Sequence, residues 1–428
     1  MKEKVLIILY YWPPAGGPGV QRWLKFVKYL SEFDVEPIVY CPENPNYPIT
    51  DETLIRQVPE QLTILKQPID EPYRLAGLLS KKSTKKISSG VIPKRKNQSL
   101  AEKAMLFVRG NFFIPDARKN WVEPSVNFLL EYLKEHKLKT VITTGPPHSL
   151  HLIGLELKKI LDINWLADFR DPWTTIGYHK TLKLTKSSEV LHAKLEMDVL
   201  NTADEIIVTS YHTKKEFSLK TNKPITVITN GYDHNPGVKI GKDKKFTLSH
   251  IGSLLSDRNP KVLWETLAEL ITESAAFSKH FQLNLIGVVS EEVLESINDF
   301  GLKSHTNIEG YVSHDAAIKF QLKSQLLLLI EIDSENTKAI IPGKLYEYII
   351  SETPILAIGP KNSDIEKIIH STNTGTYFNY NQRIHLKSQI LNYFKLYLEK
   401  NLKSEPKGVE QYSRRALTER LSTLIHSL

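Results

Sequence analysis

The sequence is poor in cysteine: Cys41 is the only one among 428 residues. A single thiol cannot form an internal disulfide, nor can it supply a cysteine-based zinc or iron–sulfur site. Chains with so little cysteine are typical of reducing compartments. We therefore expect a cytoplasmic protein, with peripheral attachment to the inner face of the cell membrane as an option.

Long apolar runs are missing as well. The run Val5–Leu9 gives way to prolines before it reaches the length of a signal-peptide core or a membrane span. The apolar stretch Ser324–Ile332 is also too short to cross a bilayer, and its composition predicts a buried strand. The sequence therefore predicts no membrane-spanning segment.

Two motifs for bound groups are absent. The turn "PPAGGPG" at 13–19 is not G-x-G-x-x-G, and no acidic residue closes the second strand, so a nicotinamide cofactor is disfavoured. The histidines lack an i,i+4 pair or an accompanying carboxylate cluster, and "IDSEN" is an unconvincing Asp-x-Asp site. We expect no cofactor and no metal.

Positive charge is concentrated in one segment. The net charge is +8, and Lys81–Lys103 holds eight Lys or Arg and one Glu, which is +7. Its few apolar residues predict a loop. It is either a patch for phosphates or an anionic membrane surface, or a solvated insertion without a partner. Nucleic acid is not expected, because aromatic residues do not interleave with these charges.

Short runs rich in Val, Ile and Leu alternate with helical patterns. This order predicts βαβ units whose parallel strands are covered on both faces. The strands are predicted at Val5–Leu9, Pro37–Tyr40, Thr140–Thr144, Trp165–Asp168, Glu205–Ser210, Ile225–Thr229, Thr247–Ile251, Gln282–Ile286, Leu326–Ile330 and Pro354–Ile358. A chain of this length predicts about two domains.

The first predicted strand ends in a glycine- and proline-rich turn. The helix that follows carries an apolar face with Val20, Leu24 and Val27. Such a turn lies at the carboxyl end of a parallel strand, where ligands bind and helix N–H groups can hold an anion. We expect Gly16 and Gly17 to come closest to a ligand, since a Cβ would push it away.

Several stretches together resemble a known family. They are "PPAGGPGVQRWLKFVKYL", "ITNGYDHN", "HIGSLLSDRNPKVLWETLAEL" and "IPGKLYEYIISETPILAIGP". The chain resembles the family 4 glycosyltransferases, which are retaining, nucleotide-sugar-dependent enzymes of the GT-B fold. Two further stretches, "VRGNFFIPDARKNWVEPS" and "TGPPHSLHLIG…WLADFRDPW", are similar to a bacterial subgroup associated with surface polysaccharides.

The resemblance implies an α/β fold of two Rossmann-like domains with a deep cleft between them. We expect an acceptor domain at 1–205 with the basic insertion at 81–103, and a donor domain at 206–408. A last helix at 409–428 would cross back to the first domain.

The resemblance also implies the donor site. Gly252, Arg258 and Lys261 would hold the diphosphate. Gly343 and Lys344 would offer N–H groups at a helix start, and Glu347 would bind the ribose hydroxyls. Two positions depart from the family pattern: Ser253 replaces an Arg, and Ala339 stands where a second Glu is often found. The donor sugar cannot be inferred.

The acceptor side is expected at the ends of two strands in the first half of the chain. His148, Asp168 and Asp171 are candidate catalytic groups, and Ser149 and Arg170 candidate contacts to the acceptor or sugar. Asp168 and Asp171 could instead cap the following turn, and His148 could be a satisfied turn residue.

The expected function is therefore metal-independent, retaining transfer of a sugar from a nucleotide-diphosphate sugar to a glycan or lipid-linked acceptor, in cell-surface polysaccharide synthesis. Three alternatives are a nucleotide-sugar epimerase, a glycogen-type phosphorylase and a non-catalytic partner protein with the same fold. Ser253 and Ala339 favour the last of these.

Overall fold

The computed structural model describes residues 2–71, 100–177, 179–233 and 240–428. The chain divides into two compact units. Unit 1 comprises Met1–Gly231 together with Arg414–Leu428, and unit 2 comprises Tyr232–Ser413. Of the predicted basic insertion at 81–103, residues 81–99 lie outside the described part of the chain.

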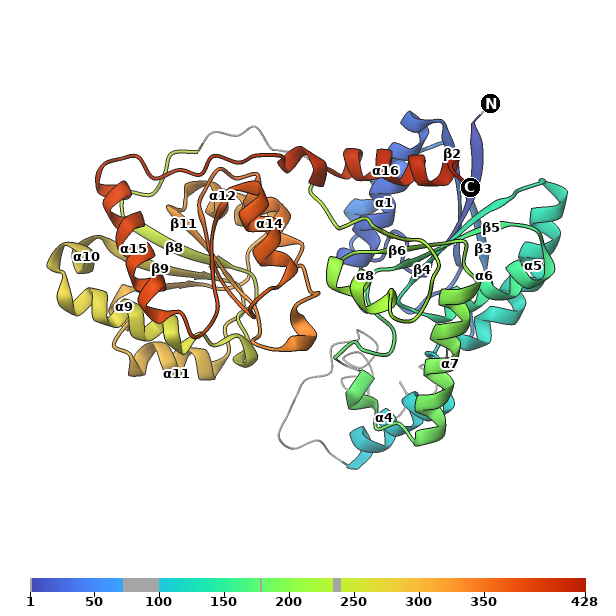
Figure 1. Cartoon of the computed structure of the whole chain (residues 1–428), viewed down its shortest axis with the longest axis horizontal. Helices are drawn as coiled ribbons and strands as arrows, with labels where there is room; N and C mark the ends of the chain where they lie inside the picture. Colours follow the sequence, from blue (N-terminus) through green and yellow to red (C-terminus); the bar gives the residue numbers. More distant parts are fainter. Residues whose placement is uncertain (1, 72–99, 178, 234–239) are drawn as a thin grey trace. The chain divides into compact units, whose positions relative to one another are not determined.

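Unit 1 contains a parallel sheet of seven strands in the order β3-β2-β1-β4-β5-β6-β7 (Figure 1). The strands are β1 (Glu3–Ile8), β2 (Val35–Pro42), β3 (Thr63–Gln67), β4 (Thr140–Gly145), β5 (Asn164–Phe169), β6 (Glu205–Val208) and β7 (Ile225–Val227). The order reverses between β1 and β4, so loops after these strands flank a point where open α/β sheets bind ligands.

Helices cover both faces of this sheet. They are α1 (Pro18–Leu30), α4 (Leu100–Phe112), α5 (Val122–Glu135), α6 (Ser149–Ile160), α7 (Lys186–Thr202), α8 (Tyr211–Phe217) and α16 (Arg414–His426). Alternate residues of β1 serve the two faces: Leu6 packs in the core with α5 and α6, and Val5 in the core with α1 and α16. This double burial explains the continuous apolar runs in the sequence.

Unit 2 is built in the same way, on six parallel strands in the order β10-β9-β8-β11-β12-β13. The strands are β8 (Phe246–Ile251), β9 (Phe281–Ile286), β10 (Thr306–Glu309), β11 (Leu326–Ile330), β12 (Ile355–Ile358) and β13 (Gly375–Phe378). Its helices are α9 (Lys261–Glu273), α10 (Ala275–His280), α11 (Glu291–Asp299), α12 (His314–Lys323), α13 (Lys344–Ile349), α14 (Asp364–Thr372) and α15 (Arg383–Leu398). Here the order reverses between β8 and β11.

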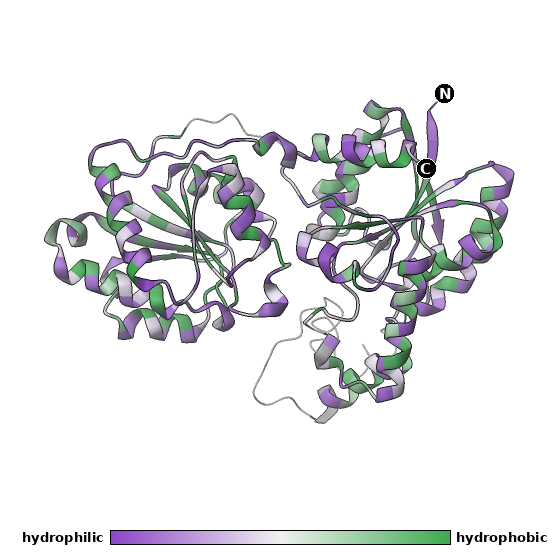
Figure 2. Cartoon of the chain, in the orientation of Figure 1, coloured by the Kyte–Doolittle hydropathy of each residue, from purple (hydrophilic) through white to green (hydrophobic). Residues whose placement is uncertain are grey.

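The ten predicted strands are all present, and three more were not predicted. These three, β3, β10 and β13, are sheet edges. Edge strands are less completely buried, and β10 is half-buried or exposed throughout. The sequences of β3 and β10, "TILKQ" and "TNIE", therefore lack a continuous apolar run. Figure 2 shows the contrast between the hydrophobic central strands and the mixed helices around them.

The last helix belongs to unit 1, as expected, and lies beside α1 (Figure 1). Leu417, Leu421 and Ile425 of α16 are buried in the core that α1 shares with the sheet. At the surface, Arg415 pairs with Glu32 at 2.8 Å. The helix itself begins at Arg414, after a short 3-10 turn at Val409–Tyr412.

The boundary between the units differs from the predicted one at 205/206. The chain first leaves unit 1 after Gly231, because β6 and β7 both pair within the first sheet. It returns after Ser413, and the two crossings run together: the Tyr232 N–H donates to the Tyr412 carbonyl at 3.1 Å. The junction therefore lies within the stretch "ITNGYDHN", after Gly231, rather than at the predicted boundary.

No helix in the described ranges is both long and apolar enough to cross a membrane.

Candidate functional site

The glycine-rich loop of unit 1 connects β1 to α1, beside the strand-order reversal. Gly17 has a φ of 96° and caps the helix, a conformation that L side chains adopt only with strain. A Cβ on Gly16 would meet the Ile49 side chain at 2.9 Å, so that glycine makes room for protein rather than for an open space. The expectation of closest approach therefore suits Gly17, around which there is open space, better than Gly16.

Gly19, which the sequence did not single out, is the glycine next to Arg170. A Cβ at Gly19 would overlap the Arg170 Nη1 atom. The Nη2 group of Arg170 donates to the Pro146 carbonyl, and its guanidinium lies 6.0 Å from the Tyr11 ring centre. Its buried Nε finds no hydrogen-bond partner among the described residues. Loops after β1, β4 and β5 thus converge on one half-buried cation.

Asp168 has a complete set of internal partners. Its carboxylate is fully buried and pairs with Arg22 at 2.9 Å. The Trp23 indole and the Thr144 hydroxyl each donate to Oδ2 at 2.8 Å. Arg22 in turn donates to the Thr229 carbonyl at 2.8 Å, just before the junction between the units. This arrangement suits a group that holds α1 against β4 and β5 better than one that exchanges protons with a ligand.

The surroundings of His148 and Asp171 differ from those of Asp168. The His148 ring is stacked on Trp173, with centroids 4.9 Å apart and planes 5° apart. Neither of its nitrogens has a hydrogen-bond partner in the described ranges, although the side chain is buried. Burial lowers the pKa of His148, so it is neutral at pH 7. Burial raises the pKa of Asp171, against the opposing effect of Arg170.

Ser149 is occupied within the protein. Its backbone N–H and its hydroxyl both donate to the Asp116 carboxylate, each at 2.9 Å. Asp116 thereby supplies hydrogen-bond acceptors at the first residue of α6. The predicted contact of Ser149 with an acceptor would have to displace this pair of hydrogen bonds.

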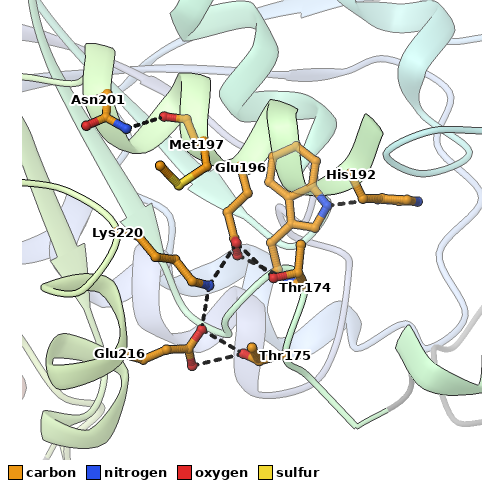
Figure 3. Close-up of polar contacts among 9 residues, drawn as sticks. Thr174, Thr175, His192, Glu196, Met197, Asn201, Glu216 and Lys220 are labelled. Atoms are coloured by element: carbon orange, nitrogen blue, oxygen red, sulfur yellow. Dashed lines mark hydrogen bonds and ion pairs between the residues drawn. The ribbon is translucent and has the colours of Figure 1, made fainter. Parts of the chain in front are cut away.

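A cluster of charges fixes the loop that follows Asp171 (Figure 3). Lys220 donates to Glu196 at 2.9 Å and to Glu216 at 2.7 Å. The Thr174 hydroxyl donates to Glu196 at 2.8 Å, and the Thr175 hydroxyl to Glu216 at 2.9 Å. The loop bearing Asp171 is therefore tied to α7 and α8. Sequence reasoning missed this cluster, because its members are far apart in the chain.

In unit 2, two residues predicted for the donor site, Gly252 and Lys344, lie close together, through the side chain of Lys344. Gly252 follows β8 with a φ of 116°, and a Cβ there would lie 3.2 Å from the Lys344 Nζ. The Nζ donates to the Ile251 carbonyl at 3.0 Å and lies 3.3 Å from the His250 Nε2. Burial lowers the pKa of Lys344 to about 8.

Arg258 joins this group through Glu331, a residue not predicted as part of the site. The Arg258 Nη2 is 3.5 Å from the Glu331 Oε2. Glu331 directly follows β11 and is 2% exposed, whereas the Arg258 side chain is 29% exposed. Burial raises the pKa of Glu331, and the positive charges of Arg258 and Lys344 partly offset this increase.

The remaining predicted donor residues lie on helices or directly before one. Glu347 is half-buried in α13 and accepts a hydrogen bond from the Gln321 amide at 2.8 Å. Gly343 is exposed immediately before α13, with open space where a Cβ would be. Lys261 is the exposed first residue of α9. The described contacts do not link Glu347 or Lys261 to the group around Arg258.

Several solved structures are similar to this chain over nearly its whole length. A glycosyltransferase from Rickettsia africae ESF-5 matches 100% of this chain and 98% of its own, at 13% identity and a TM-score of 0.57. The lipopolysaccharide outer core galactosyltransferase WaaB matches over 99% of both chains, at 13% identity and a TM-score of 0.59. A Listeria monocytogenes protein assigned as a UDP-N-acetylglucosamine 2-epimerase matches over 100% and 96%, at 13% identity and a TM-score of 0.52.

These similarities establish the fold, which is the two-domain α/β fold of the GT-B type expected from the sequence. No protein-family model matches the chain, and no curated protein matches it significantly.

Proposed function

We propose that the chain is a glycosyltransferase that moves a sugar from a nucleotide-diphosphate sugar to a glycan or lipid-linked acceptor. The observation that carries the proposal is the group at the strand-order reversal of unit 2. There Lys344 lies beside the positive-φ backbone of Gly252, Arg258 pairs with Glu331, and both cations act on the Glu331 carboxylate. The excess of positive charge suits a ligand with several anionic oxygens, such as a diphosphate.

Unit 2 would hold the nucleotide. Glu347 accepts a hydrogen bond from Gln321 through Oε2, and its Oε1 lies 3.8 Å from the His314 Nε2. We expect this carboxylate to accept hydrogen bonds from a ribose diol. Gly343 leaves the approach to α13 open. The cations would stabilise the charge that grows on the diphosphate as its bond to the sugar breaks.

Unit 1 would supply groups for the acceptor and the transferred sugar. His148, neutral and without a hydrogen-bond partner in the described ranges, could accept a proton or bind a hydroxyl. Arg170 offers a cation with an unused Nε, and Asp171 a carboxylate of raised pKa. Asp168 would position the loop through Arg22. Retention of the anomeric configuration and independence from metal are parts of the proposal that rest on the sequence resemblance, as does the cleft between the domains.

A thermal-shift screen with nucleotide sugars tests the proposal. A nucleotide sugar at a hundred times its dissociation constant should add about 2.7 kcal/mol to the free energy of unfolding. The double variant Arg258→Gln with Lys344→Met should lose the shift. If no nucleotide sugar or nucleoside diphosphate shifts the wild-type protein, the proposal is wrong.

An epimerase is the second candidate, because one of the similar structures is assigned as a UDP-N-acetylglucosamine 2-epimerase. Nuclear magnetic resonance of the donor separates the two. An epimerase would change the configuration of the sugar with no acceptor present, whereas a transferase would release nucleoside diphosphate only when an acceptor is added. Binding of the donor without either reaction would favour a non-catalytic partner protein.

A lipid-linked acceptor would place the chain at the cytoplasmic face of a membrane. Flotation with vesicles that contain anionic lipid would then retain the protein. Replacing the lysines of 81–103 by Gln should release it, because each basic residue near an anionic surface contributes about 1 kcal/mol.

A further inference from the structure

We propose that Glu331 binds a hydroxyl group of the transferred sugar, so that unit 2 recognises a sugar-bearing diphosphate and discriminates against the bare diphosphate. This inference rests on the proposed function and assigns a specificity-determining residue to the same site. Three features of the molecule support it: the place of Glu331 in the sheet, its unsatisfied oxygen and the balance of charge around it.

The fold presents Glu331 at the ligand-binding edge of the sheet. It follows β11, whose neighbour β8 leads into Gly252, and the strand order reverses between these two strands. The Tyr380 hydroxyl donates to the backbone carbonyl of Glu331 at 2.6 Å, and the Glu331 N–H donates to the Ile358 carbonyl at 2.8 Å. The backbone is therefore held on both sides while the side chain points a carboxylate into the group of cations.

That carboxylate is buried but incompletely hydrogen-bonded. Its Oε1 has no partner among the described residues, and the same is true of the Arg258 Nε. The two side chains share one long contact of 3.5 Å between Nη2 and Oε2. Buried charges normally carry a full set of hydrogen bonds, because an unsatisfied one is costly. The unfilled positions therefore point to a ligand that supplies both an acceptor for Arg258 and a donor for Glu331.

The charge balance narrows the class of ligand. A diphosphate provides acceptors for Arg258 and Lys344, yet it offers no hydrogen-bond donor to Oε1 and is repelled by the Glu331 charge. A sugar hydroxyl next to the diphosphate is a neutral donor that a carboxylate accepts readily. Arg258 is the exposed member of the pair.

The test compares two kinds of ligand on two forms of the full chain. The probes are UDP-, GDP- and ADP-glucose, the matching nucleoside diphosphates and inorganic pyrophosphate, with dissociation constants measured by calorimetry. Glu331→Gln keeps the shape of the side chain and removes its charge. It should weaken binding of the nucleotide sugar about tenfold, since a hydrogen bond to a charged acceptor is the stronger one. It should leave binding of the diphosphate unchanged or make it tighter.

Glu335→Gln is the matched control, because its side chain is 85% exposed and pairs only with Lys338 among the contacts described. It should change neither affinity. Equal weakening of nucleotide sugar and diphosphate by Glu331→Gln would assign a purely structural role, and no change in either would remove Glu331 from the site. Both outcomes overturn the inference while leaving the proposed function intact.

A second measurement avoids any loss of folding in the variant. Wild-type protein is titrated with nucleotide sugars that each lack one hydroxyl of the sugar. At least one of these deoxy analogues should bind about tenfold more weakly than the parent, and that loss should be absent in Glu331→Gln. If every deoxy analogue binds the wild type as well as the parent does, the inference is wrong. If the wild type binds none of the probes, the proposed function fails together with the inference.

Discussion

At the scale of single residues, the buried ion pair of Arg22 and Asp168 holds α1 against β5 in unit 1. Both side chains are almost fully buried, and Asp168→Ala would leave a guanidinium without its counter-charge. Such a loss destabilises a protein by about 3–5 kcal/mol. We expect urea unfolding to show this decrease in the free energy of unfolding. Hydrogen exchange of the amides in β1 and β5 provides a second measurement.

The exposed pair of Lys4 and Glu36 provides the comparison. Its atoms are 3.6 Å apart and both side chains are about half exposed. Glu36→Ala should cost about 0–1 kcal/mol, as for other exposed pairs. A similar cost for the two substitutions would show that Asp168 is less important to folding than its contacts indicate.

Lys344 gives the site a pH dependence. Its pKa is lowered from 10.5 to about 8, so above that value the folded protein loses a proton that the unfolded chain keeps. Between about pH 8 and pH 10.5, Lys344 therefore makes the free energy of unfolding rise with pH. Binding of pyrophosphate should do the opposite, weakening by up to about tenfold per pH unit above about 8, because the ammonium charge disappears.

Lys344→Arg separates this effect from other titrations, because a guanidinium stays charged throughout the range. Calorimetric titrations with pyrophosphate should then show no weakening near pH 8. If the variant and the wild type weaken in parallel, another group controls the pH dependence.

The residue scale also shows what a sequence can disclose about a site. Gly17 was found because a glycine in a loop between a strand and a helix allows a ligand to approach closely, whereas Gly252 came from the family resemblance. Gly19 was missed, since its importance comes from Arg170, which lies far away in the chain. Glu331 was missed because a strand of five buried apolar residues concealed the role of the carboxylate that follows it.

At the scale of elements, the buried strands were predictable, whereas three of the four edge strands in the described sheets were not. A strand covered on both faces requires apolar residues at every position, as in β11, whereas an edge such as β10 needs few. The closure of unit 1 by α16 came from the family resemblance, because the amphipathic pattern of a helix does not say which sheet it covers.

This helix supports a specific prediction. Leu421 is 1% exposed between α16 and the core around α1. Leu421→Ala should cost about 2–5 kcal/mol, and the exposed Thr423→Ala should cost little. Hydrogen exchange should accelerate in β1 and β2, while protection of β8 and β11 is kept. Equal loss of protection in both sheets would mean that the two units unfold as one.

At the scale of the whole molecule, the two units differ in continuity. Unit 2 is the unbroken segment 232–413 and has its own cores on both faces of its sheet. We expect this segment to fold alone, with a cooperative thermal transition and protected amides in β8 and β11. Residues 1–231 alone should remain partly unfolded, and linking 414–428 to them should restore folding. A cooperative transition in 1–231 without this addition would contradict the prediction.

The detour of the chain between Gly231 and Arg414 also sets an order of events during biosynthesis. The residues that seal the α1 side of the sheet in unit 1 leave the ribosome only after the whole of unit 2 has been translated. The N-terminal unit, although translated first, must wait with apolar surface uncovered until the other unit has been made. Its nascent form is therefore the stage at which this protein most needs protection from aggregation.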